Sequence, residues 1–177
     1  MLYFAYGSNL HHFQMKRRCK DSTFIKKINL KDFRLTFRSK YRAADIEPKK
    51  NSIVPGGLFE ISKSDEKKLD VYEDYPILYK KYYFSHYGKR VMTYTMVQKS
   101  SFRFPTERYL NVVKRGYKVC ILDQKYLEQA LSNKLTFYLF DNHMVSNGFS
   151  LKDLFKEVIL GLIIFFHLLY FLPNFGY

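Results

Sequence analysis

Three carboxylates stand close together where a predicted helix ends, and one of them could serve as a general acid/base. Asp70, Glu73 and Asp74 lie within the segment LDVYEDYP, residues 69–76. A carboxyl group that is buried among tyrosine rings and other carboxylates has its pKa raised towards neutrality, as a general base requires. Taken alone, the segment is more typical of a solvated acidic helix end.

A second candidate for chemistry is the turn Tyr6-Gly7-Ser8-Asn9, which follows a short apolar strand predicted for residues 2–6. A strand that enters such a turn points consecutive backbone N–H groups outward, and this arrangement binds a carboxylate or a carbonyl oxygen. By itself, a Gly-Ser-Asn sequence more commonly marks only a turn.

Tyr109 is the third candidate, because it lies near the start of a helix predicted after Pro105 and could offer its hydroxyl to a substrate. A lone tyrosine at such a position is more commonly a packing residue.

Together, these features and the segments between them resemble the gamma-glutamylcyclotransferase-like family, which includes the gamma-glutamylamine cyclotransferases and the plant AIG2-like proteins. The resemblance covers about residues 1–131, in the order that the family has. The matching segments are YFAYGSNL (3–10), LKDFRLTF (30–37), VPGGLFEI (54–61), LDVYEDYPILY (69–79) and the closing helical region (105–131).

The resemblance implies an enzyme, an amide-cleaving acyltransferase that cyclises a gamma-glutamyl amide to 5-oxoproline and releases an amine or amino acid. It places the catalytic acid/base at Glu73, in the segment that resembles the family's Leu-Asp-x-x-Glu-Gly motif. It also implies that no metal, nucleotide or other cofactor is needed. The residues expected to hold the substrate are Tyr6, Gly7, Ser8, Asn9, Leu10 and Tyr109.

One departure from the family pattern lies directly beside the predicted acid/base. The residue after the catalytic Glu is often Gly, but here it is Asp74. A second carboxylate there would raise the pKa of Glu73 further or change what the pocket accepts. The alternative function is therefore a non-catalytic member of the same fold that binds a small molecule or a partner.

The rest of the pattern predicts an α+β fold, with a mixed, barrel-like curved sheet and flanking short helices. The predicted strands are 33–38, a glycine-kinked strand at 53–61, and a hairpin of 79–86 with 90–97. The first two predicted helices are 9–20, with Asn9 as its cap and Leu10, Phe13 and Met15 inward, and 62–74, with Ser62 or Ser64 as its cap and Leu69 and Tyr72 inward. Two more are predicted at 106–116, capped by Thr106, and at 123–133, capped by Asp123. Loops at 39–52 and 100–105 are expected to form the rim of the pocket.

The charge and cysteine content exclude some classes of function. The net charge is +14, from 30 Lys+Arg against 16 Asp+Glu, but the basic residues are dispersed and no long basic arm is present. Dispersed charge and strand-spaced aromatics argue against specific nucleic-acid binding. Cys19 and Cys120 stand far apart without a partner at metal-ligand spacing, which is typical of a reduced, cytoplasmic protein.

The last part of the chain changes character. Residues 158–177 contain no charged residue, and we expect a hydrophobic C-terminal helix there, after a domain at 1–131 and a connecting segment at 132–157. A membrane-spanning helix needs about 20 apolar residues, and Pro173 interrupts this run. Three interpretations remain open: a membrane anchor or interfacial helix, a helix packed on the domain or a partner, and a degenerate tail.

Overall fold

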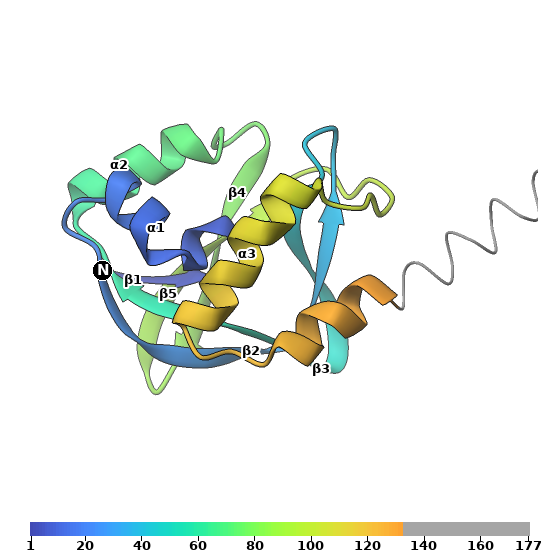
Figure 1. Cartoon of the computed structure of the whole chain (residues 1–177). Helices are drawn as coiled ribbons and strands as arrows, with labels where there is room; N and C mark the ends of the chain where they lie inside the picture. The colour runs from blue at the N-terminus through green and yellow to red at the C-terminus, as the bar shows by residue number, and fades with distance from the viewer. Residues whose placement is uncertain (133–177) are drawn as a thin grey trace, which may run out of the picture. The chain divides into compact units, whose positions relative to one another are not determined.

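A five-stranded mixed sheet forms the centre of the computed structural model, which describes residues 1–132 (Figure 1). The strands are β1 (Leu2–Ala5), β2 (Thr23–Arg38), β3 (Ala43–Glu60), β4 (Tyr79–His86) and β5 (Lys89–Met96). The helical elements are the 3₁₀ turn η1 (Ser8–Leu10), α1 (His12–Arg18), α2 (Lys63–Tyr72), α3 (Glu107–Val119) and a further helical segment at 124–132. The predicted α+β class is confirmed, whereas the helix predicted at 158–177 lies outside the described residues.

The strand order is β2-β3-β1-β5-β4, so that β1 lies in the middle of the sheet. It pairs parallel with β5 and antiparallel with β3, and the remaining neighbours pair antiparallel. The predicted mixed sheet is therefore confirmed. Because β1 is central, the turn that follows it at Gly7 starts from the middle of the sheet.

The strands β2 and β3 are much longer than the sequence pattern predicts. They form one antiparallel hairpin of 16 and 18 residues, so the expected loop at 39–52 is wrong except for its first few residues. The reason is that Pro48 to Asn51 are exposed in the middle of the hairpin, where the pairing register shifts between Phe33↔Pro48 and Lys31↔Ile53. Without a buried face, the period-two alternation that marks a strand is missing.

The first helix begins later than predicted. Residues Ser8–Leu10 form a 3₁₀ turn, α1 starts at His12, and His11 rather than Asn9 occupies the capping position. This turn shifts the helical register, so Met15 is buried while Phe13 is 68% exposed, contrary to the prediction for Phe13.

The other helix caps follow the sequence. The Ser62 hydroxyl accepts a hydrogen bond from the Asp65 N–H at 3.0 Å, and the Thr106 hydroxyl accepts one from the Tyr109 N–H at 3.3 Å. Leu69 on α2 is fully buried, as predicted, but Tyr72 is 46% exposed.

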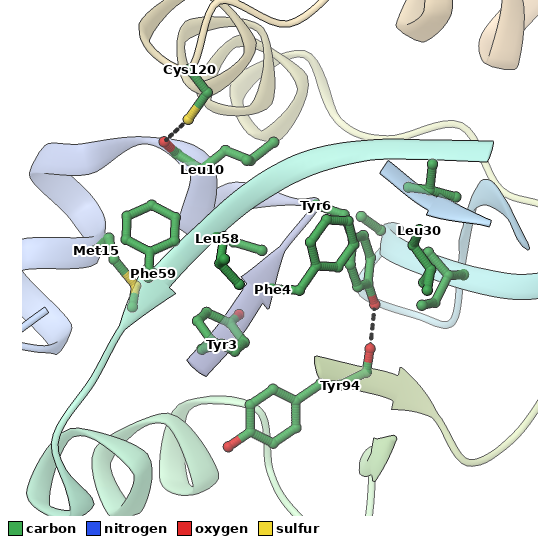
Figure 2. Packing of buried hydrophobic residues seen from close by; sticks show 14 of the residues in the cluster. Tyr3, Phe4, Tyr6, Leu10, Met15, Leu30, Leu58, Phe59, Tyr94 and Cys120 are labelled. Carbon is green, nitrogen blue, oxygen red and sulfur yellow. Dashed lines mark hydrogen bonds between the residues drawn. The ribbon is translucent and has the colours of Figure 1, made fainter. Parts of the chain in front are cut away.

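The hydrophobic core joins β1 to the helices that carry the candidate site (Figure 2). Phe4 and Leu10 are fully buried within it. Helix α3 packs on η1, and this approach requires a glycine, because a Cβ at Gly116 would lie 2.5 Å from the Leu10 Cβ. The core thus fixes the turn after β1 against α3, which carries Tyr109.

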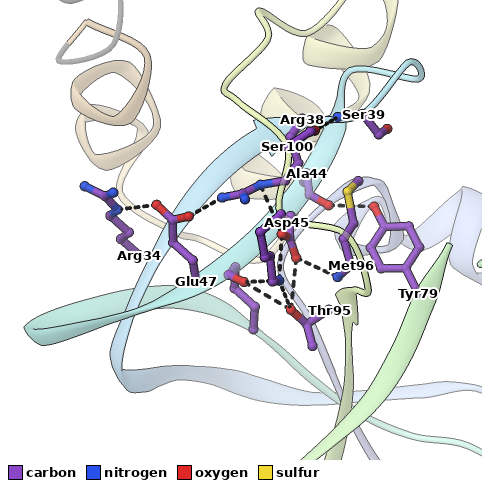
Figure 3. A network of polar contacts seen from close by, with 12 residues as sticks. Arg34, Arg38, Ser39, Ala44, Asp45, Glu47, Tyr79, Thr95, Met96 and Ser100 are labelled. Atoms are coloured by element: carbon purple, nitrogen blue, oxygen red, sulfur yellow. Dashed lines mark hydrogen bonds and ion pairs between the residues drawn. The ribbon is translucent and has the colours of Figure 1, made fainter.

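A buried polar network holds the ends of β2, β3 and β5 together (Figure 3). The Asp45 carboxylate, fully buried, lies 3.2 Å from the Arg38 Nε and 2.9 Å from the Lys99 Nζ. It also accepts a hydrogen bond from the Met96 N–H at 2.8 Å. Since a buried charge must be paired, this network locks the strand ends that flank the candidate site.

Within residues 1–132, no helix is both long enough and apolar enough to cross a membrane. The predicted membrane association concerns residues 158–177 and so falls outside the described part of the chain.

Replacing Gly56 by Ala should lower the free energy of unfolding by about 3 kcal/mol, the upper end of the usual cost of overpacking a core. A Cβ at Gly56 would lie 2.4 Å from the Ala5 carbonyl oxygen and 2.4 Å from the Phe4 ring. Urea unfolding measures the loss. Gly88→Ala is the control, because a Cβ there meets nothing within 4 Å and only its φ of +74° carries a cost, about 1 kcal/mol. Equal losses would contradict the prediction.

Candidate active site

A cavity of about 480 Å³ opens beside the turn that follows β1, against the end of α2. Of the predicted site residues, it is lined by Tyr6, Gly7, Ser8, Asn9, Glu73 and Tyr109. The structure therefore brings together three regions that are far apart in the sequence. Such a concave site with a few convergent polar groups is typical of a small-molecule pocket.

Glu73 stands at the C-terminal cap of α2, where the helix and the following turn hold its backbone. Its N–H donates to the Leu69 carbonyl oxygen at 2.8 Å, which closes the last turn of the helix. The residue as a whole is partly buried, and its carboxyl group lies in the cavity. The helix end thus delivers a single carboxylate to the turn after β1.

The side-chain amide of Asn9 holds the Glu73 carboxylate. Its Nδ2 donates to the Glu73 Oε1 at 2.9 Å and to the Tyr3 hydroxyl at 2.8 Å. On the other side, the Arg18 Nη1 donates to the Asn9 Oδ1. Because the guanidinium has only donors, it fixes the amide so that the oxygen faces Arg18 and the NH₂ group faces Glu73.

Arg18 is itself held in place by its neighbours. Its guanidinium lies 3.6 Å from the centre of the Tyr72 ring. Its Nη2 donates to the Tyr72 hydroxyl at 2.7 Å and to the Gln14 Oε1 at 2.9 Å. Helix α1 therefore contributes a cation that is held in place behind Asn9. The Asn9 amide lies between this cation and the Glu73 carboxylate and is hydrogen-bonded to both.

The pKa of Glu73 is raised to about 7. Burial is the largest cause, while the positive charge of Arg18 and the hydrogen bond from Asn9 act in the opposite direction. The predicted rise of the pKa by burial is confirmed. The predicted contribution of neighbouring carboxylates is wrong, because no carboxylate is among the causes of the raised pKa and Asp74 is exposed to solvent.

The Tyr109 hydroxyl lies beside the turn. It accepts a hydrogen bond from the Ala44 N–H at 3.1 Å, and it would lie 3.1 Å from a Cβ at Gly7. Burial raises the pKa of Tyr109 to about 12, and the Ala44 N–H partly offsets this effect. Since its oxygen accepts from the backbone, its proton remains free to be donated.

A family model described as gamma-glutamyl cyclotransferase, AIG2-like, matches residues 3–111. The chain belongs to this family. No curated protein sequence is matched.

Solved structures agree with this assignment. One is a gamma-glutamyl cyclotransferase with 26% identity and a TM-score of 0.64, and the match covers 73% of this chain and 85% of that chain. Another, described as an uncharacterized human protein, has 27% identity, a TM-score of 0.63 and the same coverage of both chains. YkqA from Bacillus subtilis, with 22% identity, a TM-score of 0.60 and coverage of 75% of this chain and 53% of that chain, supports the fold alone.

Leu10 and Tyr6 differ from the other residues expected to hold substrate. Leu10 is fully buried in the core and does not line the cavity. Its N–H donates to the Gly7 carbonyl oxygen at 3.0 Å, so this donor is already used within the turn. The Tyr6 hydroxyl donates to the Tyr94 carbonyl oxygen at 2.8 Å, which leaves its ring as the part that shapes the pocket (Figure 2).

Sequence reasoning missed Arg18 and the tyrosines that surround Glu73. Arg18 stands out in the sequence only as part of a basic cluster, Lys16-Arg17-Arg18, and nothing there distinguishes it from Arg17. Only the orientation of α1 in the fold shows that Arg18, and not Arg17, contacts Asn9. The tyrosines that also line the cavity are Tyr3, Tyr41, Tyr72, Tyr79 and Tyr94.

Replacing Arg18 by Ala should raise the pKa of Glu73 above about 7, because the cation that opposes the effect of burial is removed. The titration of the Glu73 side-chain carboxyl carbon by NMR measures the change. Arg17→Ala is a matched control on the same helix, since the Arg17 guanidinium faces Phe13 instead, at 6.0 Å from its ring centre. A fall of the Glu73 pKa in Arg18→Ala would overturn the assignment.

Glu73→Gln should stabilise the protein at pH 8 and have little effect at pH 4. The folded state raises the pKa of Glu73 from 4.5 to about 7, so it favours the protonated form. The stability that this group contributes is complete below pH 4.5 and is lost as the pH rises through about 7. Gln remains neutral, and its advantage at pH 8 should be about 2–3 kcal/mol. Urea unfolding of both proteins at the two pH values tests this, and equal differences at pH 4 and pH 8 would refute it.

Proposed function

We propose that the protein is an enzyme of the gamma-glutamylcyclotransferase type, which converts a gamma-glutamyl amide into 5-oxoproline and a free amine or amino acid. The observation that carries the proposal is the Glu73 carboxyl group, whose pKa is about 7 and which faces the Gly7–Asn9 turn in a cavity of about 480 Å³. A carboxyl group with a pKa near neutrality can both accept and return a proton at physiological pH.

In the proposed reaction, the substrate's own α-amine attacks its γ-carbonyl carbon. The α-ammonium first gives a proton to the Glu73 carboxylate, and the amine lone pair then forms the new C–N bond of the five-membered ring. As the tetrahedral intermediate collapses, the original amide C–N bond breaks, and the leaving nitrogen takes the proton from Glu73. The ring nitrogen then gives its second proton to the Glu73 carboxylate, which passes it to the released amine, so that the lactam is neutral, the amine leaves as an ammonium and Glu73 is ionised again. The attack is intramolecular, so holding the substrate in its folded conformer supplies much of the acceleration.

Backbone donors of the turn after β1 are placed to hold the oxyanion in this proposal. The N–H groups of Leu10 and His11 donate the internal hydrogen bonds of the turn, and the Ser8 N–H contacts the Tyr109 hydroxyl, so the N–H groups of Gly7 and Asn9 are the ones outside these contacts. The Tyr109 hydroxyl next to Gly7 adds a side-chain donor. One such preorganised donor is worth about 3–4 kcal/mol of transition-state stabilisation.

The comparisons support the same reaction. The family description names a gamma-glutamyl cyclotransferase, and one similar solved structure carries that name. The match spans residues 3–111 and therefore includes the turn, Glu73 and Tyr109.

The test is 5-oxoproline release from a panel of gamma-glutamyl amides by the wild type and by Glu73→Gln. We expect release by the wild type and a loss of about 10²–10⁴-fold in the variant, the usual contribution of a general base. The wild-type kcat/KM should rise with pH through about 7, because Glu73 must be ionised to accept a proton.

Glu60→Gln is the matched control, since Glu60 is exposed at the end of β3 and lies outside the cavity. Full activity in Glu73→Gln would refute the acid/base role. Silence of the folded wild type across the panel would refute the enzyme and favour a binding role for the cavity.

A further inference from the structure

Helix α3 ends in a turn that places a bulky apolar residue where glycine is usual. The Ile121 N–H donates to the Lys118 carbonyl oxygen at 3.2 Å, and the Leu122 N–H donates to the Tyr117 carbonyl oxygen at 2.9 Å. This pair of hydrogen bonds is the Schellman motif, in which the position of Ile121 has a positive φ and is most commonly Gly. The φ of Ile121 is 53°, which is a genuine outlier for a β-branched residue.

Packing does not explain the isoleucine. The Ile121 side chain is 76% exposed, and that of Val119, two residues earlier, is 46% exposed. Leu122 and Tyr117, which close the motif, are buried in the core, so the fold uses the turn but not the side chain at its tip. A left-handed conformation costs free energy in any residue with a Cβ, and strain of this kind is concentrated at functional positions.

Cations lie beside this apolar tip. The Lys27 Nζ of β2 donates to the Ile121 carbonyl oxygen at 3.1 Å. On α3, Lys114 and Lys118 are four residues apart and therefore share one side of the helix. In the part of the chain that the structure describes, neither Lys27 nor any Lys or Arg of α3 forms an ion pair. The exposed residues of α3 are Glu107, Arg108, Asn111, Lys114, Arg115, Lys118 and Val119.

The nearby acidic groups do not neutralise this end of the helix. Glu107 lies at the opposite end of α3. Asp123 follows the tip in the chain, and its carboxylate accepts a hydrogen bond from the Lys125 N–H at 2.9 Å, at the start of the next helical segment. An excess of cations around an exposed apolar tip therefore remains, and it attracts an anionic partner.

The composition of this surface distinguishes between anionic partners. Binding to single-stranded nucleic acid combines phosphate contacts with aromatic side chains on which bases stack, and no exposed residue of α3 is aromatic. A bilayer that contains anionic lipids fits both parts of the surface. Apolar side chains such as Val119 and Ile121 enter the boundary between headgroups and acyl chains, while the cations beside them contact the anionic headgroups.

The course of the chain favours the same partner. The helical segment at 124–132 follows the tip directly, and the sequence then continues to residues 158–177, which contain no charged residue. A single weak apolar anchor is marginal at a membrane and gains from a basic patch on the same chain. The basic end of α3 is such a patch.

We propose that the C-terminal corner of α3 docks the protein onto bilayers that contain anionic lipids. The apolar tip of this corner is Val119 and Ile121, and its cations are Lys27, Lys114, Arg115 and Lys118. Tyr109 of the candidate active site lies about 18 Å away along α3, at a rise of about 1.5 Å per residue. The docking surface and the cavity are therefore separate, and this inference does not depend on the proposed reaction.

The first test uses the absence of Trp from the chain, because a single introduced Trp then reports contact with lipid. The emission of full-length Ile121→Trp should shift to shorter wavelength on vesicles of phosphatidylcholine with phosphatidylserine, and brominated acyl chains should quench it. Ile77→Trp is the matched control, since Ile77 is 75% exposed and lies in the turn between α2 and β4, well away from the C-terminal end of α3 (Figure 1). No shift in Ile121→Trp, or equal shifts in both variants, would overturn the proposal.

The second test measures sedimentation with vesicles that contain or lack phosphatidylserine. Lys114→Ala/Lys118→Ala should lower partitioning onto the anionic vesicles by about 25-fold, at about 5-fold for each cation near an anionic surface, and leave the neutral vesicles unchanged. Lys63→Ala/Lys67→Ala is the control, because these lysines are exposed, four residues apart on α2 and outside any ion pair within the described residues. Residues 133–177 are present in every variant, so their contribution cancels. Equal losses in the two variants would refute a localised surface.

The third test separates docking from folding. Ile121→Gly should be more resistant to urea than the wild type, because Gly adopts a φ of 53° without strain, and yet bind the anionic vesicles more weakly. Unchanged binding would show that the tip does not enter the bilayer. Wild-type binding to single-stranded RNA but not to the vesicles at the same salt concentration would overturn the lipid partner. Loss of 5-oxoproline release is expected in none of these variants, and a wild type without this activity would refute the proposed function while leaving the docking result in place.

Discussion

The hydrogen bond from the Asn9 amide to the Glu73 carboxylate is the contact on which the site depends. It joins the turn after the central strand to the end of α2, two elements separated by 64 residues. A buried carboxylate must be satisfied by hydrogen bonds, and Asn9 can donate only if its amide is correctly oriented. Arg18 and Tyr3 determine that orientation, so α1 and β1 both become parts of the site.

Two opposing effects set the pKa of Glu73 near 7. Burial in a cavity surrounded by tyrosines favours the protonated acid, whereas Arg18 and Asn9 favour the carboxylate. Burial is the larger effect, and the pKa therefore settles at about 7 instead of returning to 4.5. A carboxylate in direct contact with Arg18 would be held ionised and could not return a proton, which gives the intervening amide a physical purpose.

The long β2–β3 hairpin also supports this site. Its first turn carries Lys40 and Tyr41, and the Ala44 N–H and carbonyl oxygen bind the hydroxyls of Tyr109 and Tyr79. The same strand end contains Asp45, which is buried with its cations. The start of β3 therefore positions Tyr109 and Tyr79, both of which line the cavity.

The sequence by itself determined the local features: the strand before Gly7, the caps Ser62 and Thr106, the buried Leu69, and a glutamate where α2 ends. Each follows from side-chain chemistry or periodicity over a few neighbouring residues. Only the tertiary structure decided that Asn9 binds Glu73 instead of capping a helix, that Arg18 and not Arg17 faces the site, and that residues 43–52 continue a strand. These outcomes depend on contacts between segments distant in the chain, and such contacts leave no mark in the spacing of nearby residues.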